Sequence, residues 1–324
     1  MSFREDAERA AARWKATTVS SPDEAREPGP VRGRGAYAFC LPESFAYLNV
    51  LPDARPAAAW FADADIAWYG GLNAGPTNHL LSSQIQCLNA LGPLAFDAAA
   101  LRWFFGGVLD IAETVPVGTP EAPNALVSFE WIGDGNPLGE WRNGRGARGT
   151  RDTSVDAVIR YNTSHGDQEL ALIEWKYVED YRAYRYDDRK LPLRLRNYRP
   201  FLEDPNSPIR TDIDQADLIC EPIYQLMRLQ LLAWRTELHD QSLSAVRLVV
   251  VAPGRNAGYH QAIPKRLSAS ASCPPTTVAD LWQGLLSRPD RFAAIDSARL
   301  LTSEAPTSDE FKARYRHSDH AVTR

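Results

Sequence analysis

The sequence predicts an α/β protein with a central sheet that helices cover on both faces. Two strand-like segments, TSVDAVIRY and ELALIEWKY, flank the short polar turn NTSHGDQ. Their apolar residues fall on both faces of each strand, which is typical of a sheet that is buried on both sides. Helix-like and strand-like segments follow one another in the order helix, strand, strand, strand, helix, strand. That order indicates one layered core.

The elements before the hairpin are predicted from hydrophobic periodicity and from the residues that begin and end helices. In chain order they are a short charged helix at 4–16, a Pro/Gly/Arg/Glu-rich linker at 17–35, a region of mixed helical and turn signals at 37–67, a helix from Asn78 or Ser82 to Gly92-Pro93, a helix at 97–112 and a strand at 124–133. A Gly-rich loop then leads into the hairpin.

The elements after the hairpin complete the predicted core. The segment ADLICEPIYQLMRLQLLAWRTEL is a long helix that places Pro222 in its first turn if it begins near Ile219. A buried strand ends at Pro253, a helix follows at 278–286, and the tail from Thr302 is mostly polar. We therefore expect an N-terminal extension at 1–74, a core at 75–255, and a C-terminal helical extension with a polar tail at 256–324.

The composition is that of a soluble globular protein, and 324 residues suffice for one large domain or two smaller ones. No apolar run reaches the roughly 18 residues of a membrane span, and the N-terminus is charged, so we expect neither a membrane segment nor a secretory signal. Four scattered cysteines without zinc spacing predict reduced thiols in a cytoplasmic protein. The net charge of −5 argues mildly against a general nucleic-acid binder.

The hairpin carries the chemistry that the sequence predicts. Asp156 and Glu174 each lie nine residues from His165, so a turn centred on His165 sets them opposite each other, with Cβ atoms about 4.5–5.5 Å apart. Glu174 and Lys176 share a face, and Trp175 points to the other. Two carboxylates this close repel each other unless a cation lies between them, and a divalent ion bound through oxygen fits that place. A one-residue slip would separate the two carboxylates.

These residues resemble the PD-(D/E)XK nucleases, the restriction-endonuclease-like fold. The strings NHLLSSQIQCLNALGPL, TSVDA, IEWKYVEDY and EPIYQLMRLQLLA resemble a branch of bacterial restriction-endonuclease-like proteins of unestablished substrate. The similarity covers roughly residues 75–255, and Thr153-Ser154-Val155 stands where the proline of the family name would be. The resemblance implies a core of helix, three strands, helix and strand, with a mixed central sheet flanked by helices.

The resemblance also implies roles for the hairpin residues. Asp156 and Glu174 hold Mg²⁺, with Mn²⁺ as a substitute, and Lys176 orients the attacking water or stabilises the transition state. The backbone carbonyl of Ile173 or Trp175 could add a further oxygen ligand. Some members place a glutamine from the following helix near the water, and Gln225 is the candidate here, ahead of Gln230.

For three residues, the sequence allows both a role at the site and a structural role. Glu130 could reach the sheet face of Asp156, or could meet solvent or pair with Arg160. Gln225 could serve the site or lie on a solvated face, and Gln84 could bond a strand or line the site. The remaining residues favour structural interpretations: Ser82 or Ser83 as a helix cap, Glu221 as a charge near a helix N-terminus, His79 and His165 as hydrogen-bonding and turn residues, and Trp175 and Tyr177 as core side chains.

Two basic stretches flank the hairpin and suit a phosphate backbone that approaches the candidate site. The first, RNGRGARGTR, carries Arg142, Arg145, Arg148 and Arg151. The second runs from Arg182 to Arg199, and its first members are Arg182 and Arg185. The alternative is that both are solvated loops. No glycine motif for binding a nucleotide phosphate occurs.

The sequence thus favours a cytoplasmic, Mg²⁺-dependent nuclease that acts on nucleic acid, with DNA as the expected substrate and no membrane partner. One alternative is a module that binds nucleic acid or a protein partner without cutting. Another is a hydrolase of small phosphodiesters. A homodimer and further protein partners stay open, as do sequence specificity, end or internal cleavage, the number of metal ions, and the choice among restriction, phage defence and repair.

Overall fold

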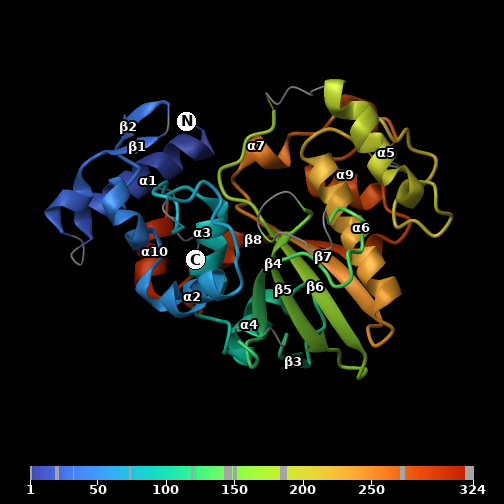
Figure 1. The fold of residues 1–324 in the computed structure, drawn as a ribbon, viewed down its shortest axis with the longest axis horizontal. Coiled ribbons are helices and arrows are strands. Elements are labelled where there is room, and N and C mark those ends of the chain that lie inside the picture. The colour runs from blue at the N-terminus through green and yellow to red at the C-terminus, as the bar shows by residue number, and fades with distance from the viewer. Residues whose placement is uncertain are drawn as a thin grey trace.

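The computed structural model describes residues 2–18, 22–31, 33–72, 74–117, 120, 122–141, 148, 152–182, 188–270 and 274–317. Figure 1 shows a central sheet between two groups of helices, with the N-terminal and C-terminal segments side by side in one of them. This mixed α/β architecture confirms the predicted fold class.

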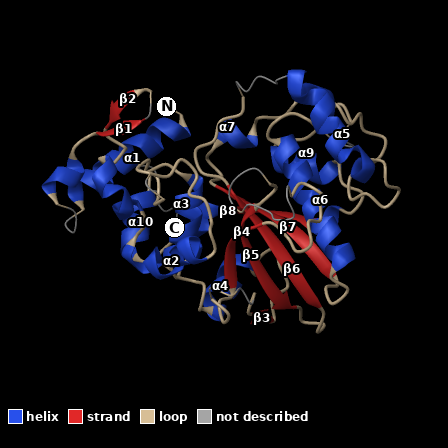
Figure 2. Cartoon of the chain, viewed as in Figure 1, coloured by secondary structure: helices blue, strands red, loops and turns tan. Residues whose placement is uncertain are grey.

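The central sheet has six strands and is mixed (Figure 2). They are β3 (Glu113–Val115), β4 (Val127–Trp131), β5 (Val155–Asn162), β6 (Gln168–Trp175), β7 (Ala245–Ala252) and β8 (Phe292–Asp296). The order is β3-β5-β6-β7-β8, and β4 also pairs with β5. Pairs that involve β3, β4 or β5 are antiparallel, whereas β6, β7 and β8 run parallel. A separate two-stranded sheet joins β1 (Gly29–Val31) and β2 (Gly35–Tyr37).

Alternating side chains of the central strands enter two hydrophobic cores, one on each face of the sheet. Ile159, Ile173 and Trp175 belong to the first core, and Val158 and Leu172 belong to the second. Because successive residues of a strand point to opposite faces, a strand buried on both sides is apolar at nearly every position. The sequence pattern of the two hairpin strands is thereby explained.

Each core is closed by its own helices. The first is covered by α1 (Phe3–Thr17), α2 (Arg55–Asp63), α3 (Ser83–Leu91), α4 (Ala98–Phe105) and α10 (Asp309–Tyr315). The second is covered by α5 (Leu191–Leu202), α6 (Ile223–His239), α7 (Ala257–His260), α8 (Lys265–Ser268) and α9 (Val278–Gly284). Short 3-10 helices lie at Asp23–Arg26, Glu43–Asn49, Pro52–Ala54, Asp188–Lys190, Pro289–Arg291 and Ser297–Leu301.

Three expectations need correction. Helix α6 begins at Ile223, so Pro222 is its N-cap residue rather than part of its first turn. The predicted helix at 97–112 ends at Phe105, where Gly106 and Gly107 follow. The C-terminal segment is not only helical and polar: it adds β8 to the sheet, and the buried side chains of Phe311 and Tyr315 anchor α10.

The first and last helices pack against each other through a buried arginine. Arg314 is 1% exposed and donates hydrogen bonds to the carbonyl and side-chain oxygens of Asn49 and to the carbonyl of Leu80. Its guanidinium lies 4.8 Å from the centre of the Trp14 ring. Hydrogen bonds to a charged donor are stronger than neutral ones, so Arg314 ties three distant segments together.

None of the helices in the described part of the chain combines the length and the apolar character that crossing a membrane requires.

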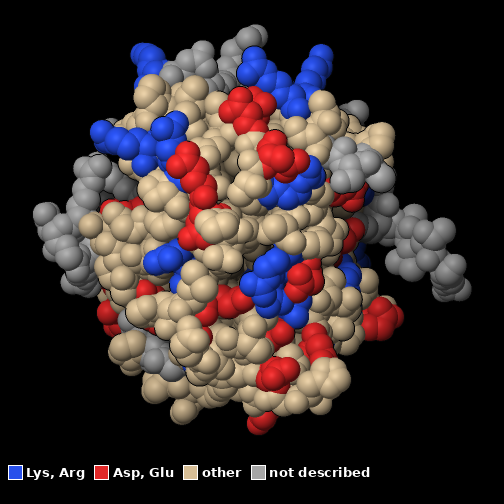
Figure 3. All heavy atoms as spheres, turned by 90° about the vertical axis from the view of Figure 1, so that its right-hand side faces the viewer, with Lys and Arg blue, Asp and Glu red and all other residues tan. Residues whose placement is uncertain are grey.

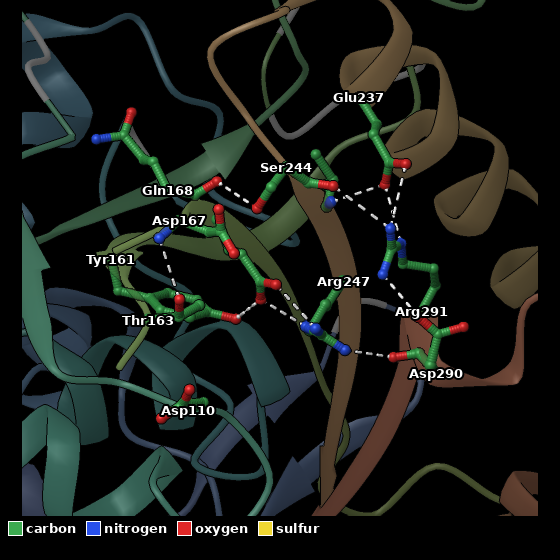
Figure 4. Close-up of polar contacts among 12 residues, drawn as sticks. Asp110, Tyr161, Thr163, Asp167, Gln168, Glu237, Ser244, Arg247, Asp290 and Arg291 are labelled. Carbon is green, nitrogen blue, oxygen red and sulfur yellow. Dashed lines mark hydrogen bonds and ion pairs between the residues drawn. The ribbon is translucent and has the colours of Figure 1, made fainter. Parts of the chain in front are cut away.

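An ion-pair network closes the end of the sheet at which β6 and β7 begin (Figure 4). Arg247 donates two hydrogen bonds to the Glu169 carboxylate, at 2.6 and 2.8 Å, and the Tyr161 hydroxyl donates a third at 2.7 Å. Burial raises the pKa of Glu169, but the bonds from Arg247 and Tyr161 outweigh it and lower that pKa below the usual 4.5. The network therefore stabilises the fold only while Glu169 is ionised.

Replacing Glu169 with Gln should lower the free energy of unfolding at neutral pH and reduce its acid dependence. A carboxyl whose pKa is depressed in the folded state stabilises that state above pH 4.5, and the stabilisation is lost as the pH falls through the folded-state pKa. Denaturant unfolding from pH 7 to pH 3 measures the difference from the unsubstituted protein. The exposed Glu113→Gln is the control. A difference that grows toward low pH would contradict this account.

Candidate active site

The register of the β5–β6 hairpin is the one that the sequence predicts. Ala157 pairs with Ile173 and Asn162 with Gln168, so paired residues lie equally far from His165. In the turn, Gly166 adopts a φ of 85°, and the Thr163 amide donates to the Asp167 carbonyl at 2.8 Å. That backbone conformation favours glycine. Glycine at the turn thus helps to fix which residues face each other.

This register brings Asp156 to the strand segment that carries Glu174. The Trp175 amide donates a hydrogen bond of 2.6 Å to the Asp156 carboxylate. The Asp156 carboxyl group lies close enough to Glu174 to influence its pKa. Asp156 is partly exposed, whereas Glu174 is 3% exposed. The two acids therefore form a carboxyl pair that solvent reaches from the side of Asp156.

Lys176 and Gln225 complete a closed set of contacts around Glu174. The Lys176 ammonium donates to Glu174 Oε1 at 2.7 Å and to Gln225 Oε1 at 2.6 Å. The Gln225 amide in turn donates to Glu174 Oε1 at 2.6 Å. Gln225 is partly exposed and comes from the first turn of α6, which packs on this face of the sheet. Of the two interpretations of Gln225, the structure favours the one that places it at the site.

Glu130 lies on β4 beside Asp156. The pairs Phe129–Ala157 and Trp131–Val155 flank the two acids, and Glu130 has a φ of 48°. Its carboxylate accepts hydrogen bonds from Gln84 Nε2 at 2.6 Å and Ser154 Oγ at 3.1 Å. The expected alternatives, solvent or a pair with Arg160, are not observed: Glu130 is 6% exposed, and Arg160 pairs with Asp240.

Gln84 fixes Glu130 from the opposite core. Its side chain also accepts from the Tyr69 amide at 2.9 Å and donates to the Ala67 carbonyl at 3.2 Å. All of these bonds hold the carboxamide in one orientation. Gln84 therefore fixes the orientation of the Glu130 carboxyl group on β4, which agrees with the interpretation that Gln84 bonds a strand.

Burial and neighbouring charges raise the pKa values of the three carboxyl groups. Burial, then Glu174 and Glu130, raise the pKa of Asp156 well above its usual range. Burial likewise raises the pKa of Glu174 against the opposing effect of Lys176, and it raises that of Glu130 to about 7. For Lys176, burial lowers the pKa, but Glu174 and other groups outweigh it, and the pKa is well above its usual range. One cation, Lys176, thus lies among two buried acids and the partly exposed Asp156.

Asp156 and Glu174 have the chemistry of ligands for a hard divalent cation. Burial is the main cause of both raised pKa values, and a bound cation would stabilise the ionised carboxylates. Within the described ranges, no group of three or more His, Cys, Asp or Glu side chains is arranged to hold a metal ion. A metal ion at this place would have Asp156 and Glu174 as carboxylate ligands, and the Trp175 backbone contacts Asp156 through its amide. Mg²⁺ commonly retains several waters and so tolerates few protein ligands.

The other predicted residues have structural contacts. Ser82 caps α3, and His79 is largely buried, with its Nδ1 accepting from the Leu81 amide at 3.2 Å. His165 is an exposed turn residue. Tyr177 and Trp175 are core side chains. Gln230 is 1% exposed, and its Oε1 has no hydrogen-bond partner among the described residues.

The arginines of the predicted basic stretches do not form one group. Arg148 donates to Ser128 and to the backbone carbonyls of Phe129 and Glu130, so it supports β4. Arg182 is half exposed and pairs with Asp180. Arg142, Arg145, Arg151 and Arg185 lie outside the described residues.

Two residues near the carboxyl groups escaped the sequence analysis. Ser154, which holds Glu130, stands two positions before Asp156, where a hydroxyl so close to a candidate ligand was a usable signal. The Tyr181 ring lies 6.0 Å from Lys176 Nζ. Tyr181 belongs to the series of tyrosines that interrupts the second basic stretch, and nothing in that series distinguishes it.

Comparison with known protein families gives one match. The family described as Restriction Endonuclease associating with ARP matches residues 7–316, nearly the whole chain. No curated protein and no solved structure matches.

Mg²⁺ should raise the free energy of unfolding of the protein through Asp156 and Glu174. A ligand that binds only the folded state at one hundred times its dissociation constant adds about 2.7 kcal/mol. Asp156→Asn should abolish this gain, because it removes one of the two anionic ligands. Thermal unfolding with increasing MgCl₂ measures it, and Asp110→Asn, at an exposed aspartate, is the control. An equal gain in the Asp156 variant would assign the metal to other residues.

Proposed function

The chain belongs to the restriction endonuclease family described as associating with ARP, and on that premise we propose that it is a metal-dependent nuclease of the PD-(D/E)XK type. Its reaction is the hydrolysis of phosphodiester bonds in nucleic acid, with DNA as the first substrate to test. The observation that carries the proposal is the convergence of Asp156, Glu174, Lys176 and Gln225 at the end of β6.

In this proposal Asp156 and Glu174 hold Mg²⁺, for which Mn²⁺ can substitute. The bound ion supplies Lewis acidity at the phosphate and lowers the pKa of a coordinated water. The Lys176 ammonium is held at 2.7 Å from Glu174 and 2.6 Å from Gln225. From that position it hydrogen-bonds the attacking water or offsets the charge that builds on the phosphate oxygens. Fixed charges in a water-poor site are typically the largest contribution to such catalysis.

Gln225 acts as a positioning residue. It accepts from Lys176 and donates to Glu174, so it keeps the ammonium beside the carboxyl group instead of leaving it free to rotate away. Glu130 lies one strand further on and adds negative charge near Asp156. Its anchoring by Gln84 and Ser154 supports a role in shaping the field at the metal rather than direct contact with substrate.

A basic helix beside the site supports a polymeric substrate. The exposed cations of this region are Arg189, Lys190, Arg196 and Arg199. Helix α5 adjoins α6 through the Tyr198 and Tyr224 rings, whose centres are 5.9 Å apart, and Tyr224 directly precedes Gln225. In Figure 3, basic side chains gather along the upper rim of this side of the molecule. Cations in such a position suit the phosphate backbone of a nucleic acid better than a small phosphodiester.

Lys176→Ala and Asp156→Asn should each lower cleavage at least about 100-fold while leaving the fold intact, because each removes a charge that acts on the reacting phosphate. The assay uses supercoiled plasmid, linear duplex and single-stranded DNA with Mg²⁺, Mn²⁺ or EDTA, and far-UV circular dichroism checks folding.

Cleavage by folded variants at the unsubstituted rate would refute the assignment of these residues. DNA binding without cleavage under any condition would favour the binding module. Hydrolysis of a chromogenic phosphodiester alone would favour the small-molecule hydrolase.

Gln225→Leu should lower cleavage by roughly 10- to 100-fold, the usual effect of removing a residue that orients a metal-site group. The matched control is Gln230→Leu on the same helix. Gln230 is buried, its Oε1 has no hydrogen-bond partner in the described part of the chain, and its replacement should leave the rate unchanged. The two variants are compared by their rates of cleavage of the same plasmid at saturating Mg²⁺. Equal losses would show that the effect comes from helix packing rather than from the contact with Lys176.

A further inference from the structure

A cavity of about 270 Å³ lies on the face of the sheet opposite the carboxyl pair. It opens where the parallel strands β6, β7 and β8 end, between α1, α10 and the 3-10 helix Ser297–Leu301. Its aromatic lining residues are Phe3, Trp175, Tyr177, Phe311, Tyr315 and His317. Small-molecule sites in proteins with open parallel sheets are commonly found beyond the carboxyl ends of the strands.

Three polar side-chain atoms that line this cavity take part in none of the hydrogen bonds among the described residues. Gln86 is 4% exposed, and its Oε1 accepts from the Trp175 indole at 3.0 Å, whereas none of the hydrogen bonds among the described residues uses its Nε2. The same holds, within that part of the chain, for the hydroxyls of Tyr177 and Ser297, which are 1% and 8% exposed. Donors that no protein group satisfies are available to a ligand or to water.

We propose that this cavity binds a nucleobase, either free or as part of a nucleotide. Flat aromatic rings offer stacking surfaces, which every base can use. The Gln86 amide and the two hydroxyls offer hydrogen bonds to ring nitrogens and exocyclic oxygens. A purely apolar ligand would leave these donors unsatisfied, and a simple anion would leave the aromatic walls without contact.

The size and the rim of the cavity agree with a single base. Its volume lies at the lower end of the range for small-molecule sites, about 300–1,000 Å³, which excludes a folded polymer. Arg255 lies at the rim, where its side chain is 40% exposed and pairs with Asp6 at 3.3 Å. A guanidinium there suits the phosphate of a nucleotide whose base lies inside.

A ligand in this cavity would contact Trp175, whose side chain and backbone amide serve opposite faces of the sheet. The Trp175 indole lines the cavity, while its backbone amide holds the Asp156 carboxylate. The proposal does not depend on nuclease activity, because the cavity and the carboxyl pair use different side chains. Its test therefore measures binding alone.

The test is isothermal titration of the full chain with adenine, uracil, AMP, UMP, a five-nucleotide single-stranded DNA and ribose 5-phosphate. We expect heat from at least one base-containing probe and none from ribose 5-phosphate, which has no base. The probe that binds most tightly shows whether the site takes a free base, a nucleotide or a base of an oligonucleotide. No binding of any base-containing probe, or equal binding of ribose 5-phosphate, overturns the proposal.

Two variants locate the site. Ala298→Trp fills the cavity without removing a polar group, and it should weaken binding at least tenfold. Ala294→Trp is the control, since Ala294 is exposed on β8 outside the cavity. If Ala298→Trp does not fold, Gln86→Leu replaces it, with the same expected loss. Unchanged affinity in the folded cavity variant would place the bound base elsewhere and refute the assignment.

Discussion

The pairing of β5 with β6 is the constraint on which the rest of the candidate site depends. Side chains alternate faces along a strand, so a shift by one residue would carry Asp156 to the opposite core and leave Glu174 without its neighbour. The turn around Gly166 and the two hydrophobic cores resist that shift together, because each core selects one set of alternating residues. Packing that stabilises the sheet therefore also sets the distance between the acids.

The site also concentrates unfavourable electrostatics in a well-packed region. Glu130, Glu174 and Lys176 are at most 6% exposed, and Asp156 is partly exposed. The pKa of each of the three acids is raised. Burying charge is costly, and the surrounding amides of Gln84 and Gln225 offset only part of that cost. Such arrangements are typical of functional sites, where the packing of the rest of the fold offsets the unfavourable free energy of the buried charges.

Local patterns predicted the hairpin, and tertiary contacts account for what was missed. Alternating apolar residues around a polar turn predicted both the strands and their register, and a shared helix face with the family resemblance predicted Gln225. The contact of Gln84 with Glu130 joins residues 46 positions apart, and no local signal encodes it. Strand β8, with the sequence FAAID, lacks the β-branched enrichment of a typical strand. The charge pattern did not predict the role of Arg148, whose guanidinium donates a hydrogen bond to the backbone of β4.

The packing of α1 against α10 bears on when the fold can be completed during synthesis of the chain. A ribosome adds roughly 5–20 residues per second, so α1 leaves it tens of seconds before α10 can join it. Until then Trp14 lacks the Arg314 guanidinium, and Asn49 and Leu80 lack the donor that links them. The core behind Trp175 is completed last, after every acid of the site has been made. A nascent chain thus holds Asp156, Glu174 and Lys176 before it has the scaffold that arranges them.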